Sequence, residues 1–145
     1  MLSESDILQR ANRPGLFNSH NGISVTAVRD GRGRGALEVS DTSLNPHGTV
    51  HGGCLYTLAD TVAGSAVASG SGQSCVTVSG TLEFLHPATG PKIQCSASPK
   101  KTGRSLWVMQ VELTDQHGKM VATGTFIFML VRPADGKMAG EARQP

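Results

Sequence analysis

One long helical pattern in the middle of the chain, over residues 53–69, constrains the fold more than any other feature. Its apolar positions fall at offsets 0, 3, 4, 7, 8, 11 and 12 from the first, which is the stripe of a helix that buries one face. The stripe consists of Leu55, Leu58, Ala59, Val62, Ala63, Ala66 and Val67. Because most of these side chains are small, a sheet can curve closely around them. The pattern predicts one core helix.

Strand-like runs with alternating apolar residues flank this helix on both sides. Two precede it, over 22–27 and 36–40, and four follow it, over 76–84, 93–98, 106–114 and 120–131. The predicted fold is therefore α+β, with a curved antiparallel sheet of five to six strands around a long central helix. We expect a helical segment over 1–20, one domain over 21–131 and a flexible tail over 132–145.

Composition excludes several classes of protein. With 145 residues, 38% hydrophobic and 17% charged, the chain fits one folded domain rather than a disordered one. A net charge of +2 is too small to indicate nucleic-acid binding. Cys54, Cys75 and Cys95 lack zinc-finger or CxxC spacing, which is typical of free thiols in a reducing compartment. Without a signal-peptide or membrane-span pattern, we expect a cytoplasmic protein.

The segment that leads into the central helix carries the clearest chemical signal. Two adjacent glycines, Gly52 and Gly53, open the helix, and Asp60 follows two turns later. Free N–H groups at a helix start favour developing negative charge, and a carboxylate can act as a base or a nucleophile. Together they indicate chemistry on a carbonyl group. The alternative is that Asp60 is only a solvated residue on the polar helix face.

The spacing of these two features indicates more than one subunit. Gly53 and Asp60 are seven residues apart, which is about 10 Å along a helix. One carbonyl group cannot contact both, so we expect active sites shared between the subunits of a homodimer. Open sheets also leave edge strands that commonly pair with a second subunit.

Three motifs resemble the PaaI-like branch of the hotdog-fold acyl-CoA thioesterases. They are residues 51–61 (HGGCLYTLADT), residues 80–87 (GTLEFLHP) and the basic hairpin 100–104 (KKTGR), within a resemblance that covers about 20–131. The resemblance implies a hotdog fold, dimers that pair into tetramers, and hydrolysis of an acyl-CoA to a free acid and coenzyme A. It favours an aryl-acyl group of the phenylacetyl or hydroxybenzoyl type, and it implies no metal or redox cofactor.

The same resemblance assigns catalytic roles to five residues. It makes Asp60 the nucleophile or general base, and the Gly53 backbone N–H the donor to the oxyanion. It makes Asn45 the residue that orients the nucleophile or water, and Thr77 a hydroxyl that holds the water. His51 polarises the carbonyl or braces the loop, and we favour bracing. Each has a plainer reading as well; Asn45, for example, could simply start a turn before a proline.

The resemblance also assigns residues to the coenzyme A moiety. Lys100, Lys101 and Arg104 could contact its phosphates through charge-assisted bonds. His86 and Pro87 would shape the neighbouring nucleotide site. A basic hairpin tip that is merely solvated explains the three cations equally well.

Other functions are less consistent with the sequence. A non-catalytic acyl-CoA-binding sensor or accessory protein needs no carboxylate at Asp60. A hotdog dehydratase or hydratase uses a histidine and an acidic residue in a motif that we do not find here. A zinc site at His47, His51 and Cys54 lacks a fourth ligand.

Overall fold

The computed structural model describes residues 1–132 of the chain and consists of one sheet and one long helix with short helices alongside. The helical elements are α1 (Glu4–Ala11), α2 (Phe17–His20), the 3₁₀ turn η1 (Asp41–Ser43) and α3 (Gly52–Ser71). The strands are β1 (Ile23–Arg29), β2 (Arg32–Glu38), β3 (Ser74–Phe84), β4 (Lys92–Thr102), β5 (Leu106–Thr114) and β6 (Met120–Val131).

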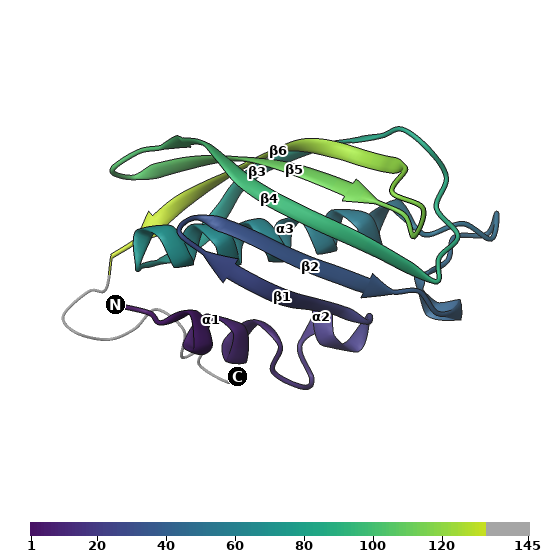
Figure 1. Cartoon of the computed structure of the whole chain (residues 1–145), viewed down its shortest axis with the longest axis horizontal. Helices are drawn as coiled ribbons and strands as arrows, with labels where there is room; N and C mark the ends of the chain where they lie inside the picture. The colour runs from purple at the N-terminus through teal and green to yellow at the C-terminus, as the bar shows by residue number, and fades with distance from the viewer. Residues whose placement is uncertain (133–145) are drawn as a thin grey trace.

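The six strands form a single antiparallel sheet in the order β1-β2-β4-β5-β6-β3. The sheet curves over α3 without closing, so β1 and β3 are its two edges (Figure 1). α3 crosses beneath the sheet between β2 and β3, and β3 therefore lies on the far edge, beside the last strand. This is the predicted hotdog arrangement, and it is confirmed.

The apolar stripe of α3 fills the concave face of the sheet. All seven predicted stripe residues are buried, with Leu58, Val62 and Val67 at 0% exposure. β2 reaches the helix closely because it carries glycine there. A Cβ on Gly35 would overlap Val62 Cγ2 and lie 2.6 Å from the Ser24 carbonyl oxygen. Because Gly35 has no side chain, the backbone of β2 packs directly against the Val62 side chain of α3.

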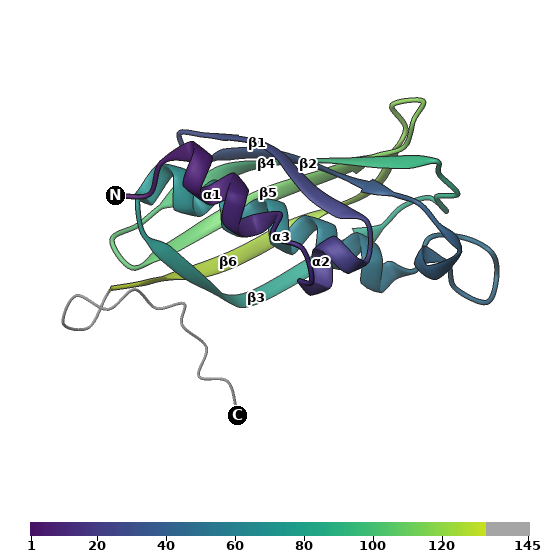
Figure 2. The ribbon, with the colours of Figure 1, turned by 90° about the horizontal axis from the view of Figure 1, so that it is seen from below.

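The N-terminal helix α1 lies outside the sheet and packs against β1 and α3 (Figure 2). The Ser3 hydroxyl oxygen caps it by accepting a hydrogen bond from the Asp6 N–H, and the Asp6 carboxylate accepts one from the Ser3 backbone N–H. This reciprocal capping box fixes where the helix starts. The segment over 1–20 that was predicted to be helical thus contains α1, whose Ile7 side chain is buried.

The predicted element boundaries differ from the structure mainly at hairpins. α3 extends from Gly52 to Ser71 and ends where Gly72 adopts a left-handed φ of 70°. β2 begins at Arg32, not at 36, because the turn has only two residues, Asp30 and Gly31, both with positive φ. β4 continues to Thr102, so Lys100 and Lys101 lie in a strand and not in a turn. The predicted tail lies almost entirely outside the described residues.

Candidate active site

Asp60 of α3 and Thr77 of β3 form a direct pair. Thr77 Oγ1 donates a hydrogen bond of 2.6 Å to Asp60 Oδ1. The chain returns after α3 so that β3 runs back along the helix, and this brings together two residues 17 positions apart. A β-bulge follows immediately, since the register with β6 shifts between Thr77 and Ser79. The two predicted catalytic residues are thus in contact within one chain.

The surroundings of Asp60 make its carboxylate more basic. Burial raises the pKa of Asp60, and the hydrogen bond from Thr77 opposes this shift only in part. Cys75 lies close by, and burial, followed by the charge of Asp60, raises the pKa of its thiol to about 11. The thiol is therefore protonated at neutral pH, and Sγ lies 3.4 Å from the Gly64 carbonyl oxygen. Of these two groups, Asp60 rather than Cys75 is the candidate for reaction with a substrate.

An open pocket of about 400 Å³ lies beside the Asp60–Thr77 pair. One side is α3, where small residues leave room for a ligand, and Phe128 of β6 adds an aromatic surface. The other side is the N-terminal segment, which contributes Leu2, Ile7, Arg10 and Ala11. This second wall has no signature in the sequence, because the packing of α1 on α3 depends on tertiary contacts.

At the start of α3, the His51 side chain caps the helix. Its Nδ1 accepts a hydrogen bond of 2.8 Å from the Gly53 N–H. The neutral ring then carries its proton on Nε2. The Gly53 N–H, predicted to be the oxyanion donor, is therefore engaged here, whereas the Gly52 N–H has no partner within residues 1–132. The sequence analysis did not assign Gly52 the role of oxyanion donor, although it is the first helical residue and its N–H is one that a helix leaves unbonded.

Asn45 is held inside the loop before α3. Its Nδ2 donates to Thr49 Oγ1 at 2.9 Å, and its Oδ1 accepts from the N–H groups of His47 and Thr49. These bonds fold residues 45–49 into a tight turn, as the plainer reading of Asn45 supposed. The side chain shapes the loop that leads to His51, and its catalytic role stays a prediction.

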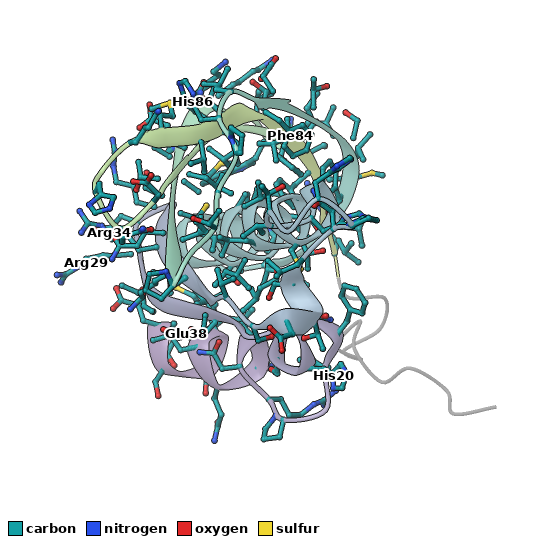
Figure 3. All side chains as sticks on the ribbon, turned by 90° about the vertical axis from the view of Figure 1, so that its right-hand side faces the viewer. His20, Arg29, Arg34, Glu38, Phe84 and His86 are labelled. Carbon is teal, nitrogen blue, oxygen red and sulfur yellow. The ribbon has the colours of Figure 1, made fainter. Side chains whose placement is uncertain are left out.

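His86 and Pro87 lie in the connection after β3, at the same end of the molecule as the start of α3. Both are exposed, and Figure 3 looks onto this end with Phe84 and His86 labelled. The ring of Phe84 covers Gly52, since a Cβ there would lie 3.2 Å from two ring atoms. This end therefore gathers His51, Gly52 and Phe84.

The basic residues Lys100, Lys101 and Arg104 lie at the opposite end, on and beside the β4–β5 hairpin (Figure 1). All three are exposed, and Lys100 Nζ donates to Thr125 Oγ1 at 3.1 Å. None of them lines the pocket beside Asp60. Within one chain the structure does not bring these cations near the candidate catalytic residues.

The predicted site residues thus form two separate groups in a single chain. Asp60 lies in the middle of α3 and is bonded to Thr77 of β3. Asn45, His51 and Gly53 lie at the start of α3 and in the loop before it. Among residues 1–132, no three His, Cys, Asp or Glu side chains cluster to hold a metal ion. In that same part of the chain, no helix is long and apolar enough to cross a membrane.

Comparisons with known proteins point to one family. The family model described as Thioesterase superfamily matches residues 47–122. Acyl-coenzyme A thioesterase PaaI of Escherichia coli (strain K12) is 31% identical over 102 residues, which cover 70% of this chain and 72% of that protein. Human acyl-coenzyme A thioesterase 13 is 30% identical over 105 residues, covering 70% and 75% of the two chains.

Solved structures agree with these sequence relatives. The E. coli PaaI structure superposes with a TM-score of 0.80 at 24% identity, over 91% of this chain and 99% of that one. A hypothetical thioesterase from Streptococcus pneumoniae, solved with coenzyme A, has a TM-score of 0.71 at 30% identity, over 75% of this chain and 85% of that one.

Proposed function

The chain belongs to the thioesterase superfamily, and we propose that it hydrolyses an aryl-acyl-CoA to a free acid and coenzyme A. Its PaaI-like branch comprises acyl-CoA thioester hydrolases, so the reaction class follows from the family. The observation that carries the assignment of Asp60 is its pairing with Thr77 at the edge of a pocket. No cofactor is needed, since coenzyme A is part of the substrate.

In the proposed reaction, Asp60 acts on the thioester carbonyl in one of two ways. As general base, it takes a proton from water while the water oxygen bonds to the carbonyl carbon. As nucleophile, its own oxygen forms that bond and water later hydrolyses the anhydride. In both, the C–S bond breaks and the sulfur leaves as thiolate, which then takes up a proton. Thr77 holds one carboxylate oxygen and leaves Asp60 Oδ2 to react.

A second group must stabilise the negative charge on the carbonyl oxygen. The start of α3 supplies backbone N–H groups and the positive end of the helix dipole. We propose the Gly52 N–H as the donor, because the Gly53 N–H already bonds to His51 Nδ1. His51 then acts by bracing the helix start, and Gly53 could donate only if that bond opened.

These two groups complete one site only if two chains contribute. Asp60 lies about 12 Å along α3 from Gly52 at the helical rise per residue. We propose a homodimer formed along β3, an edge strand with half-exposed Val76 and Val78 (50% and 54%). Asp60 and Thr77 of one chain would then face Gly52 of the partner, and such dimers would pair into a tetramer.

The remaining assignments concern the substrate. The pocket of about 400 Å³, with Phe128 on one side, suits an aromatic acyl group. Lys100, Lys101 and Arg104 are proposed to contact the phosphates of coenzyme A, and no carboxylate within residues 1–132 lies within 4 Å of them. His86 and Pro87 are proposed to border the nucleotide.

The test is coenzyme A release from a panel of aryl- and alkyl-acyl-CoAs by wild type, Asp60→Ala and the control Asp115→Ala, which lies outside the pocket. We expect Asp60→Ala to lose about two orders of magnitude or more in kcat, in line with acid–base contributions, and the control to retain activity. Unchanged turnover in Asp60→Ala would refute the mechanism. A wild type that binds acyl-CoA but releases no coenzyme A would indicate the non-catalytic sensor, and enoyl-CoA hydration would indicate the hydratase.

The two modes of Asp60 are distinguished by a single turnover in ¹⁸O-labelled water. A general base directs the label into the free acid. A nucleophile directs it into the Asp60 carboxylate, which mass spectrometry of the peptide detects.

A further inference from the structure

The wall that α1 contributes to the Asp60 pocket lies outside the residues that the thioesterase family model matches. The family model begins at residue 47, whereas Ile7, Arg10 and Ala11 belong to Glu4–Ala11. Arg10 and Ala11 lie three and four positions after Ile7, so the three residues share one face of α1. The pocket therefore combines a catalytic carboxylate of the family with a wall that the family match does not prescribe.

Arg10 gives this wall a positive charge, and Asp60, the carboxylate that lines the same pocket, is bonded to Thr77. It is the only cationic side chain lining the pocket, whose other α1-side residues, Leu2, Ile7 and Ala11, are apolar. On the opposite side, the Ser65 hydroxyl is already bonded to the Thr61 carbonyl oxygen at 2.8 Å. A polar group on a ligand would find Arg10 as its strongest donor.

The guanidinium of Arg10 is not consumed by the protein in residues 1–132. The ion pairs there join Arg29 to Glu4 and Lys92 to Glu38. Asp6, one helical turn before Arg10, accepts hydrogen bonds from the Ser3 hydroxyl at 2.6 Å and from the Ser3 backbone N–H. These bonds, and to a lesser extent the charge of Arg10, lower the pKa of Asp6. Within residues 1–132 neither Asp6 nor Asp60 forms an ion pair with Arg10, and Asp60 accepts from Thr77.

From this arrangement we propose that Arg10 selects acyl groups that carry a carboxylate at the end remote from the thioester. The proposal rests on the thioesterase function and specifies its substrate class. A carboxylate pairs with a guanidinium through charge-assisted bonds, whereas a methyl or unsubstituted phenyl end gains nothing from that charge. The negative charge of Asp60 disfavours such an anion at the reacting end, so the carboxylate must bind away from it.

The test compares acyl-CoAs that differ only in the terminal carboxylate: adipoyl- against hexanoyl-CoA, and 4-carboxybenzoyl- against benzoyl-CoA. In each pair, kcat/KM of the carboxylated member should be the higher. Arg10→Gln, which keeps an extended stem, should lower this ratio roughly tenfold or more, as expected for a lost charged hydrogen bond. Arg10→Lys should restore part of it, and added salt should reduce it in the wild type.

Arg13→Ala is the control, because Arg13 is exposed like Arg10 and lies three residues farther on, but does not line the pocket. The proposal is wrong if Arg10→Gln leaves both ratios unchanged, if the wild type prefers the neutral members, or if Arg13→Ala lowers the ratios equally.

Binding of non-hydrolysable thioether analogues of adipoyl- and hexanoyl-CoA, followed by calorimetry, separates this proposal from the catalytic one. A carboxylate preference that depends on Arg10 would support the selection even if the chain hydrolysed nothing. Equal binding of the two analogues to wild type would overturn the selection while hydrolysis by Asp60 still stood.

Discussion

Thr77 Oγ1 donates to Asp60 Oδ1 over 2.6 Å and so links the edge strand β3 to the middle of α3. This bond is the one interaction that favours the charged form of Asp60 against the effect of its burial. The pKa of Asp60 is therefore set first by burial and then, in the opposite direction, by a residue of the edge strand.

Thr77→Val should move the acidic limb of the kcat/KM profile to higher pH. The hydrogen bond from Thr77 lowers the pKa of Asp60, so its loss should raise that pKa and with it the pH at which activity falls. Thr77→Ser keeps the donor and should keep the profile. Thr81→Val, on the same strand but without a bond to Asp60, is the control, and an equal shift there would contradict the assignment.

Asp60→Asn should stabilise the protein at neutral pH. Because the pKa of Asp60 is higher in the folded chain than its ordinary 3.8, the folded state holds the proton longer, and stability falls as pH rises through that interval. At pH values above that interval, the charged Asp60 lowers the free energy of unfolding, and solvent reduces this effect because the group is only partly buried.

Urea midpoints of wild type and Asp60→Asn at pH 7 and below pH 3.8 measure this effect. The variant should be the more stable at pH 7, and its advantage should vanish at the lower pH. Asp115→Asn is a control for which we expect the opposite effect on the free energy of unfolding. The backbone N–H of Lys119 in particular lowers the pKa of Asp115, so that variant should be the less stable at pH 7.

Shared active sites predict complementation between two inactive variants. Gly52→Pro removes the backbone N–H at a helix position that accepts proline, whereas Gly52→Ala keeps the N–H and serves as its control. Co-expressed chains carrying Asp60→Ala and Gly52→Pro should recover about a quarter of wild-type activity, because half of the dimers are mixed and each has one intact site. No recovery would mean that each site lies within one chain.

Gly35→Ala should destabilise the fold by about 3 kcal/mol, near the upper range for overpacking. The added methyl group would overlap Val62 and approach the Ser24 carbonyl oxygen to 2.6 Å. Gly33→Ala should cost less, since its nearest neighbour, the Val62 carbonyl oxygen, lies 3.0 Å away. Urea unfolding measures both, and a smaller loss for Gly35→Ala than for Gly33→Ala would contradict the packing argument.

The sequence predicted those parts of the fold whose signal is local. The stripe from Leu55 to Val67 has helical spacing, and Gly72 ends the helix, so α3 was predicted to within a few residues. The start of β2 was wrong because Arg32 and Gly33 look like turn residues, and only the two-residue turn at Asp30 and Gly31 frees them to pair.

The site was predicted less completely, for reasons of tertiary structure. Asp60 and Thr77 were named, but their contact depends on how β3 returns along α3. The Gly53 N–H donates a hydrogen bond to the His51 side chain, and nothing in the sequence distinguishes such a bonded N–H from a free one. Arg10 carried no signal at all, because only the docking of α1 on α3 brings it to the pocket.

The place of β3 in the sheet also affects how the chain is made. β3 pairs with β6 and with no other strand of its own chain within residues 1–132, and β6 ends at Val131. A ribosome must therefore synthesise nearly the whole domain before Thr77 can be held against Asp60. Until β6 has been synthesised, the apolar helix α3 and the unpaired strand β3 are both present in the growing chain. Contacts of such wide sequence separation form slowly. The reactive centre is thus among the last parts of the molecule to form.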